Sequence, residues 1–321
     1  MEKLRDPWLV AAWPGMGFVG HLAAAYLARS LSAEVTGEVP PREHFDLAKV
    51  DVKNGIVVPR QPPRTLLSTW RGGDHPHDLL ILQSERQPET GSRRFCDEVI
   101  AMAKEQGVVR TFTFAAMGMP TSPDAPSRVF AAATDVALAS ELRALGVEFL
   151  ADGEIGGMNG LLLASAAERG LSGACLLGEF PFFASAVPNP KAAASILRVF
   201  SRISGVPIDV TELDHQAAEV QKQLMALVKQ LEEVARAQSA SQGRSGRKEA
   251  EEEREKEGAE DWPAPANDGD LAPEDQQRIE GLFVAAAHDR SKAIQLKTEL
   301  DRLDVFKRYE NRFLDLFKRA E

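Results

Sequence analysis

Along residues 1–237, short runs of aliphatic and β-branched residues alternate with segments of helical periodicity, and this alternation constrains the fold most strongly. The pattern predicts strands over residues 8–12, 34–39, 55–58, 65–70, 79–83, 109–115, 148–151 and 174–178. It predicts helices over residues 19–31, 92–105, 131–145, 160–168 and 190–204. Such alternation indicates an α/β sandwich with helices on both faces of a mainly parallel sheet. Because residues 35–70 have few helical signals, the sheet is expected to be mixed.

The composition divides the chain into three parts. Residues 1–237 carry the alternating pattern and form the expected α/β core. Residues 238–273 are rich in Ser, Gly, Pro and charged residues, and they have little apolar surface to bury, so they predict a flexible charged linker. Residues 274–321 return to apolar helical spacing and predict a C-terminal amphipathic helical segment.

A long helix is expected to end the core, beginning near Thr211 as its N-cap. Apolar residues recur along it at alternating spacings of four and three, and they include Leu213, Val220, Leu224, Leu227 and Leu231. Such a heptad seam packs against a partner helix, either in the same chain or in a neighbouring subunit. An ordinary helix that faces the core explains the same pattern.

Glycine-rich turns follow four of the predicted strands. The first, GMGFVG at residues 15–20, matches the G-x-G-x-x-G pattern of dinucleotide-binding proteins. Because parallel strands end at one edge of a sheet, the four turns are expected to meet around one pocket. The candidate pocket residues are Gly15, Gly17, Gly20, Gly118, Thr121, Glu154, Asn159 and Glu179. The alternative is that the glycines form structural turns and that Glu154 and Glu179 cap helices.

The chemistry available in these turns is limited. A phosphate site would be expected to contain Arg or Lys, whereas these turns contain acids. His21 could donate a hydrogen bond to an anion, or could lie exposed or cap its helix. The loop at residues 72–78, with His75, His77, Asp74 and Asp78, could ligate a metal or simply form a turn. No Gly-x-Ser-x-Gly elbow, HExxH pair or Walker A lysine is present, so no catalysis, metal or cofactor is predicted.

The charge and apolar content exclude other classes of function. A net charge of -10 disfavours binding to nucleic acid and to anionic membrane surfaces. No apolar run reaches the roughly 20 residues that a membrane span needs. Cys96 and Cys175 are the only cysteines, which favours a reducing compartment. We therefore expect a cytoplasmic protein whose partners are proteins or small molecules.

Several motifs in chain order resemble one known family. GMGFVG at 15–20, GMPT at 118–121, GEIGGMNGLLL at 153–163, CLLGEFP at 175–181 and the helix start at 190–194 look like the PAC2 family of proteasome assembly chaperone 2 and its archaeal and bacterial relatives. This resemblance implies a mixed α/β sandwich similar to the purine nucleoside phosphorylase fold. It also implies homo-oligomers, often trimers or larger, and a function in proteasome assembly or proteasome binding.

The sequence departs from this family at one point. Relatives that dock on proteasomes end in a hydrophobic residue, then Tyr, then any residue, whereas this sequence ends Lys318-Arg319-Ala320-Glu321. Docking through a C-terminal tail is therefore not expected, which leaves an assembly surface on the core. The sequence as a whole predicts a homo-oligomeric protein-binding scaffold, with proteasome subunits or another protein as partner. The alternative is a nucleoside- or nucleotide-binding protein or enzyme that uses the glycine-rich pocket.

Overall fold

The structure is a computed structural model that describes residues 3–41, 44–45, 50–59, 61–230, 273–288 and 292–303, together with positions 305, 309 and 312–313. It divides into two compact units, Met1–Gln221 and Lys222–Glu321. The predicted core boundary at residue 237 lies outside the described residues, as does all of the predicted linker except Pro273. In the residues that are described, no helix is long and apolar enough to cross a membrane.

The first unit is built on one eight-stranded sheet with the order β2-β5-β6-β1-β7-β10-β8-β9. Its strands are β1 Trp8–Ala12, β2 Glu34–Val39, β5 Thr65–Trp70, β6 Leu79–Ser84, β7 Arg110–Met119, β8 Val129–Ala133, β9 Glu148–Phe149 and β10 Ser172–Pro181. The four central strands β6, β1, β7 and β10 are parallel. Strand β5 runs antiparallel to β2 and β6, and β8 runs antiparallel to β10 but parallel to β9. The predicted mixed, mainly parallel sheet is therefore confirmed.

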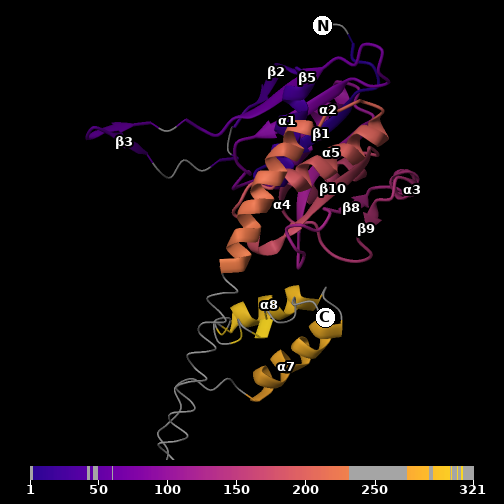
Figure 1. Ribbon diagram of the computed structural model, residues 1–321. Coiled ribbons are helices and arrows are strands. Elements are labelled where there is room, and N and C mark those ends of the chain that lie inside the picture. The colour runs from indigo at the N-terminus through magenta and orange to yellow at the C-terminus, as the bar shows by residue number, and fades with distance from the viewer. Residues whose placement is uncertain are drawn as a thin grey trace, which may run out of the picture. The chain divides into compact units, whose positions relative to one another are not determined.

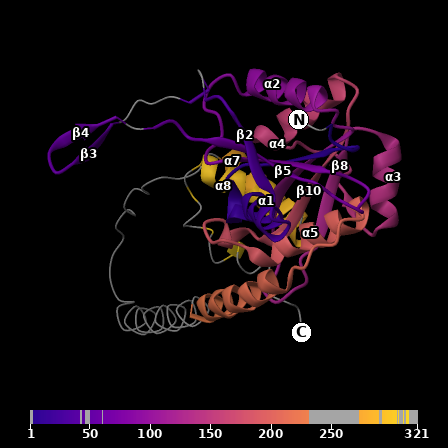
Figure 2. The ribbon, with the colours of Figure 1, turned by 90° about the horizontal axis from the view of Figure 1, so that it is seen from above.

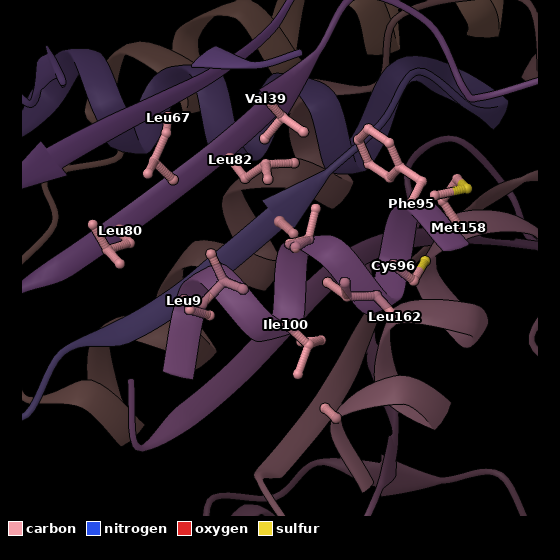
Figure 3. Packing of buried hydrophobic residues seen from close by; sticks show 14 of the residues in the cluster. Leu9, Val39, Leu67, Leu80, Leu82, Phe95, Cys96, Ile100, Met158 and Leu162 are labelled. Carbon is pink, nitrogen blue, oxygen red and sulfur yellow. The ribbon is translucent and has the colours of Figure 1, made fainter. Parts of the chain in front are cut away.

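Helices cover both faces of this sheet, as Figures 1 and 2 show. They are α1 Val19–Ser30, α2 Ser92–Glu105, α3 Val136–Ala144, α4 Gly157–Glu168 and α5 Pro190–Ser204. On one face α2 and α4 pack on the sheet through an apolar cluster that includes Leu9, Phe95 and Leu162 (Figure 3). On the other face, Phe200 of α5 lies edge-on against the rings of Trp8, Phe112 and Phe114. The structure thus has the expected three layers.

The prediction of a helix over residues 131–145 is wrong for its first residues. Val129–Ala133 forms strand β8, which pairs antiparallel with β10, and α3 begins only after Asp135. The carboxylate of Asp135 accepts a hydrogen bond from the Leu138 N–H at 2.9 Å and so caps this helix. Alanine favours helix in isolation, but pairing with a buried neighbouring strand decides the outcome for the alanines of β8.

Two other strands are longer than expected, and this moves candidate site residues. The observed β7 runs to Met119 and β10 runs to Pro181, so Gly118 and Glu179 lie inside strands and not in the turns after them. Helix α4 begins earlier than expected, at Gly157, so Asn159 lies in its first turn.

The predicted long helix is present over residues 211–230, the last residues described before position 273. Leu213 and Leu224 are buried, Val220 is partly buried and Leu227 is exposed, whereas Leu231 lies outside the described residues. Asp209 accepts hydrogen bonds from both the backbone and the hydroxyl of Thr211, so Asp209 supplies the capping oxygen at this helix start. Within the first unit, ion pairs join Arg29 to Glu212 and Arg198 to Asp214.

In its described part, the second unit contains the end of the long helix, residues 222–230, and the helices α7 Pro273–His288 and α8 Ala293–Arg302. Their buried residues include Ile279, Phe283, Leu296 and Leu300.

Two strands of the first unit, β3 Asp51–Lys53 and β4 Ile56–Val58, form a separate two-stranded sheet.

Candidate functional site

The first glycine turn has an unusual backbone. After β1, the short helix η1 Met16–Phe18 leads into α1, and both Gly17 (φ 56°) and Phe18 (φ 50°) adopt the left-handed conformation. Gly17 has no Cβ and adopts this conformation at little cost, but a bulky residue such as Phe18 loses roughly 1–2 kcal/mol there. Surrounding contacts must therefore hold this strained turn in place.

Those contacts come from the connection between β10 and α5. The Gly17 N–H donates to the Ser185 carbonyl at 2.7 Å, and the Asn189 N–H donates to the Gly17 carbonyl at 2.8 Å. The Phe18 N–H is also used, because it donates to the Gly15 carbonyl at 3.0 Å. Two N–H groups that a bound pyrophosphate would need are thus already occupied, which disfavours a dinucleotide at this turn.

Exposed apolar side chains surround this turn. Met16 is 55%, Phe18 43% and Phe183 41% exposed, and Phe183 lies on the second short helix, η2 Phe182–Ala184. The Gly17–Ser185 hydrogen bond places η1 beside the residues that follow η2. We call Met16, Phe18, Phe182 and Phe183 the turn surface. Exposed aromatic and methionine side chains on a rigid backbone are typical of protein-binding surfaces.

The structure brings together only part of the predicted pocket. A Cβ added at Gly17 or at Gly118 would lie 3.6 Å from the ring of Phe180 in each case. Phe180 is almost fully buried, so its ring fills the space between the two glycines. A Cβ added at Gly15 would have no other atom within 4 Å, so Gly15 lies at the open side of the turn.

Other candidates have separate structural roles or positions. Gly20 packs directly against β7, because an added Cβ would lie 2.0 Å from the Phe114 carbonyl oxygen. Thr121 lies just after β7, and Glu154 is exposed in the segment before α4. Asn159 lies in the first turn of α4, and its buried Oδ1 has no hydrogen-bond partner among the described residues.

The buried carboxylate of Glu179 forms an ion pair with a half-exposed residue that the sequence motifs did not indicate, Arg128. The guanidinium donates from Nε to one carboxylate oxygen at 2.8 Å and from Nη2 to the other at 2.9 Å. The Arg128 side chain is 49% exposed and the Glu179 side chain only 3%. These hydrogen bonds raise the pKa of Arg128 well above its usual value. Because its carboxylate is engaged by Arg128, Glu179 holds the start of β8 against β10 and is poorly placed to bind a nucleoside.

The basic groups near the turns are not arranged for an anion. Burial lowers the pKa of His21, so its imidazole is neutral at pH 7. Lys191, at the start of α5, also has its pKa lowered by burial, and its Nζ donates to the Pro123 carbonyl at 2.8 Å and to Gln221 Oε1 at 3.0 Å. The electrostatics of this edge therefore do not favour phosphate.

In the loop at residues 72–78, the histidines and Asp78 contact other protein groups and do not gather around a metal position. Asp78 is buried and accepts hydrogen bonds from the Gly72 and Arg5 N–H groups at 2.7 and 2.8 Å. His77 stacks on Trp8 while His75 lies beside Trp70. The two imidazoles thus contact different tryptophans, and no metal-binding group of three His, Cys, Asp or Glu residues occurs in the part of the chain that is described.

A groove that the sequence did not predict lies along β2, β5 and β6. Its volume is about 340 Å³, and its lining includes Glu34, Thr36, Leu67, Trp70 and Leu80. Leu4 and Gln106, which lie ahead of β1 and β7 in the chain, also line it. The groove is therefore at the end of the sheet where the central strands begin, whereas the glycine turns are at the end where those strands finish.

The strain at Phe18 leads to a stability prediction. Asparagine tolerates the left-handed conformation better than phenylalanine, so Phe18→Asn relieves strain while it loses a partly buried ring. The two effects offset each other, and we expect the free energy of unfolding to stay within about 1 kcal/mol of wild type in urea denaturation. A loss above about 2 kcal/mol would show that Phe18 is a core residue and not part of a binding surface.

Comparison with known proteins agrees with the fold. The sequence profile of the PAC2 family matches residues 9–228. The structure resembles PbaB of Pyrococcus furiosus, described as an archaeal proteasome activator, with 29% identity and a TM-score of 0.60 over 71% of this chain and 95% of that one. It also resembles a PAC2 family protein from Streptomyces avermitilis, with 28% identity and a TM-score of 0.61 over 69% and 96% of the two chains.

A third solved structure is similar over a slightly larger share of the chain. It is PbaA of Pyrococcus furiosus, described as an archaeal homologue of a proteasome-assembly chaperone, with 26% identity and a TM-score of 0.56 over 75% of this chain and 95% of that one. Since the family profile covers well over half of the sequence, in agreement with the motif order and the fold, the chain belongs to the PAC2 family.

Proposed function

We propose that this chain is a cytoplasmic protein-binding scaffold that assists the assembly of a larger complex, with proteasome subunits as its partner. It acts as a homo-oligomer and catalyses no reaction. The observation that carries this proposal is the turn surface, in which Met16, Phe18 and Phe183 are exposed and Phe182 is partly buried, on a backbone fixed by the contacts of Gly17.

The physical argument concerns what such a surface can bind. A scaffold must recognise its partner's surface without a large rearrangement, and rigid aromatic side chains lose little conformational entropy on binding. Phe18 adopts a left-handed backbone, and strained backbone tends to occur at functional sites. The descriptions of PbaB and PbaA support proteasome subunits as the partner class.

The proposal is tested with purified proteasome α subunits of the same organism. Native mass spectrometry of α subunits mixed with the full-length chain is expected to detect a mixed complex and faster formation of α-subunit rings. Bovine serum albumin at the same concentration is the control. Absence of both a mixed complex and a change in ring formation would contradict the proposal.

A second candidate function is small-molecule binding at the start of α4. The observation that favours it is the buried Oδ1 of Asn159, which a ligand N–H could satisfy. Differential scanning fluorimetry with nucleosides and nucleotides tests it, because a ligand at 100 times its Kd adds about 2.7 kcal/mol of stability. An unchanged melting temperature with every compound would reject this candidate.

A further inference from the structure

The hairpin formed by β3 and β4 is a sheet of only two strands. Asp51, Val52 and Lys53 pair antiparallel with Val58, Val57 and Ile56 in that order. Asn54 (φ 51°) and Gly55 (φ 79°) join the strands, and two successive left-handed residues are the signature of a type I′ turn. Figure 2 shows β3 and β4 as a ribbon of their own, and neither strand joins the main sheet.

This hairpin exposes an apolar face. Side chains alternate across a strand pair, so Val50, Val52 and Val57 share one face while Asp51 and Lys53 share the other with Ile56 and Val58. Val52 is 63% and Val57 61% exposed. An isolated two-stranded hairpin is at best marginally stable in water, and further strands on its edge stabilise it. The hairpin is therefore expected to gain stability from a partner that adds strands to its edge.

The edge of β3 is complementary to itself. In a hairpin with a two-residue turn, Lys53 and Ile56 form the hydrogen-bonded closing pair, so the next pair, Val52 and Val57, points its N–H and C=O groups outward. If two copies of β3 run antiparallel about a two-fold axis at Val52, the two Val52 residues can exchange both backbone hydrogen bonds. Asp51 of each copy then lies opposite Lys53 of the other, which forms two cross-strand ion pairs.

We propose that β3 pairs with β3 of a second copy about a two-fold axis at Val52, to form a continuous four-stranded sheet β4-β3-β3-β4. The valines of both hairpins then form one apolar face. This inference rests on the self-association in the proposed function and specifies its surface. A two-fold contact of this kind also fits a larger assembly with an even number of copies.

The charge distribution favours a second copy over an unrelated partner. Residues 50–59 carry one acid and one base and are neutral, on a chain with a net charge of -10, so two copies can approach here without the repulsion expected elsewhere. The opposite charges at positions 51 and 53 match under two-fold antiparallel pairing. By contrast, the exposed edge strand β2 has a register irregularity between Val35 and Gly37, a feature that discourages strand addition.

Sedimentation velocity of the full-length chain tests this pairing by charge reversal. Lys53→Glu and Asp51→Lys each place like charges opposite one another at both ion pairs, and each is expected to raise the Kd of self-association about tenfold. The double variant D51K/K53E restores opposite charges and is expected to return the Kd to within about threefold of wild type. Equal weakening in the double variant would overturn the proposal.

Proline variants test which edge pairs. Val52→Pro removes an N–H that points outward and so leaves the single hairpin intact, but it blocks pairing between β3 strands, and the assembly mass is expected to halve. Val57→Pro is the matched control, because it blocks only the edge of β4 and is expected to leave the mass unchanged. Circular dichroism melting checks that both variants keep the wild-type core.

The outcomes separate this inference from the proposed function. A wild-type oligomer whose mass Val52→Pro leaves unchanged would overturn the β3 pairing and leave self-association standing. A wild-type chain that stays monomeric at the highest concentration would overturn the β3 pairing and the self-association together. Binding to α subunits is measured separately, so its absence would contradict the proposed function without affecting the hairpin.

Discussion

Replacing Gly20 with alanine is expected to destabilise the α/β unit by about 3 kcal/mol or more. The added Cβ would lie 2.0 Å from the carbonyl oxygen of Phe114 and 2.6 Å from its carbon, so α1 must move away from β7. Overpacking of a close backbone contact usually costs about 1–3 kcal/mol, and here a rigid backbone group is the obstacle. Urea denaturation measures this loss of stability, and the Tm is expected to fall by about 10 °C in thermal denaturation.

Gly15→Ala is the matched control for this prediction. Gly15 belongs to the same turn, but its backbone is extended and an added Cβ has no neighbour within 4 Å. The stability of this variant is expected to stay within about 0.5 kcal/mol of wild type. Similar losses in both variants would mean that the motif as a whole, and not the contact of α1 with β7, sets the stability.

Arg128→Met is expected to destabilise the same unit by about 3 kcal/mol. It leaves the carboxylate of Glu179 buried without its bidentate partner, and breaking a buried ion pair typically costs about 3–5 kcal/mol. The lower end of this range applies because Arg128 is half exposed, and water therefore reaches that end of the pair. Chemical denaturation at pH 7 measures the effect.

The double variant R128M/E179Q tests the cause of that loss. A neutral amide is less costly to bury than a carboxylate, so the double variant is expected to be more stable than R128M by at least about 1 kcal/mol. If the separate effects of R128M and E179Q simply add, then the loss in R128M reflects packing of the arginine stem and not the unpaired charge.

Local sequence signals predict much of the fold but not the pairing at its edge. The bounds of β1, β2, β5, α2 and α5 agree with the predicted ranges, because each of these elements has clear periodicity and turn residues at its ends. The strand β8 was not predictable in this way, since its alanines suit a helix and only pairing with β10 makes them a strand.

The candidate site depends even more on contacts between distant residues. Glycine motifs predict that Gly17 and Gly118 lie at the same edge of the sheet, but the strand lengths that direct the ring of Phe180 between them are not visible in a local pattern. Arg128 is 51 residues from Glu179 in the sequence, and the antiparallel register of β8 with β10 brings them together. The exposed phenylalanines were missed because an aromatic residue in an apolar stretch normally predicts burial.

The central claim is that the turn surface binds a protein partner, and the affinity of the full-length chain for purified proteasome α subunits tests it most directly. Phe18→Asn is expected to raise the Kd at least about tenfold in isothermal titration calorimetry, because loss of a central aromatic contact costs more than 1 kcal/mol. The control Val136→Asn removes an exposed apolar side chain on α3, outside the turn surface, and is expected to leave the Kd within about twofold of wild type. Equal affinity of Phe18→Asn and wild type would contradict the claim.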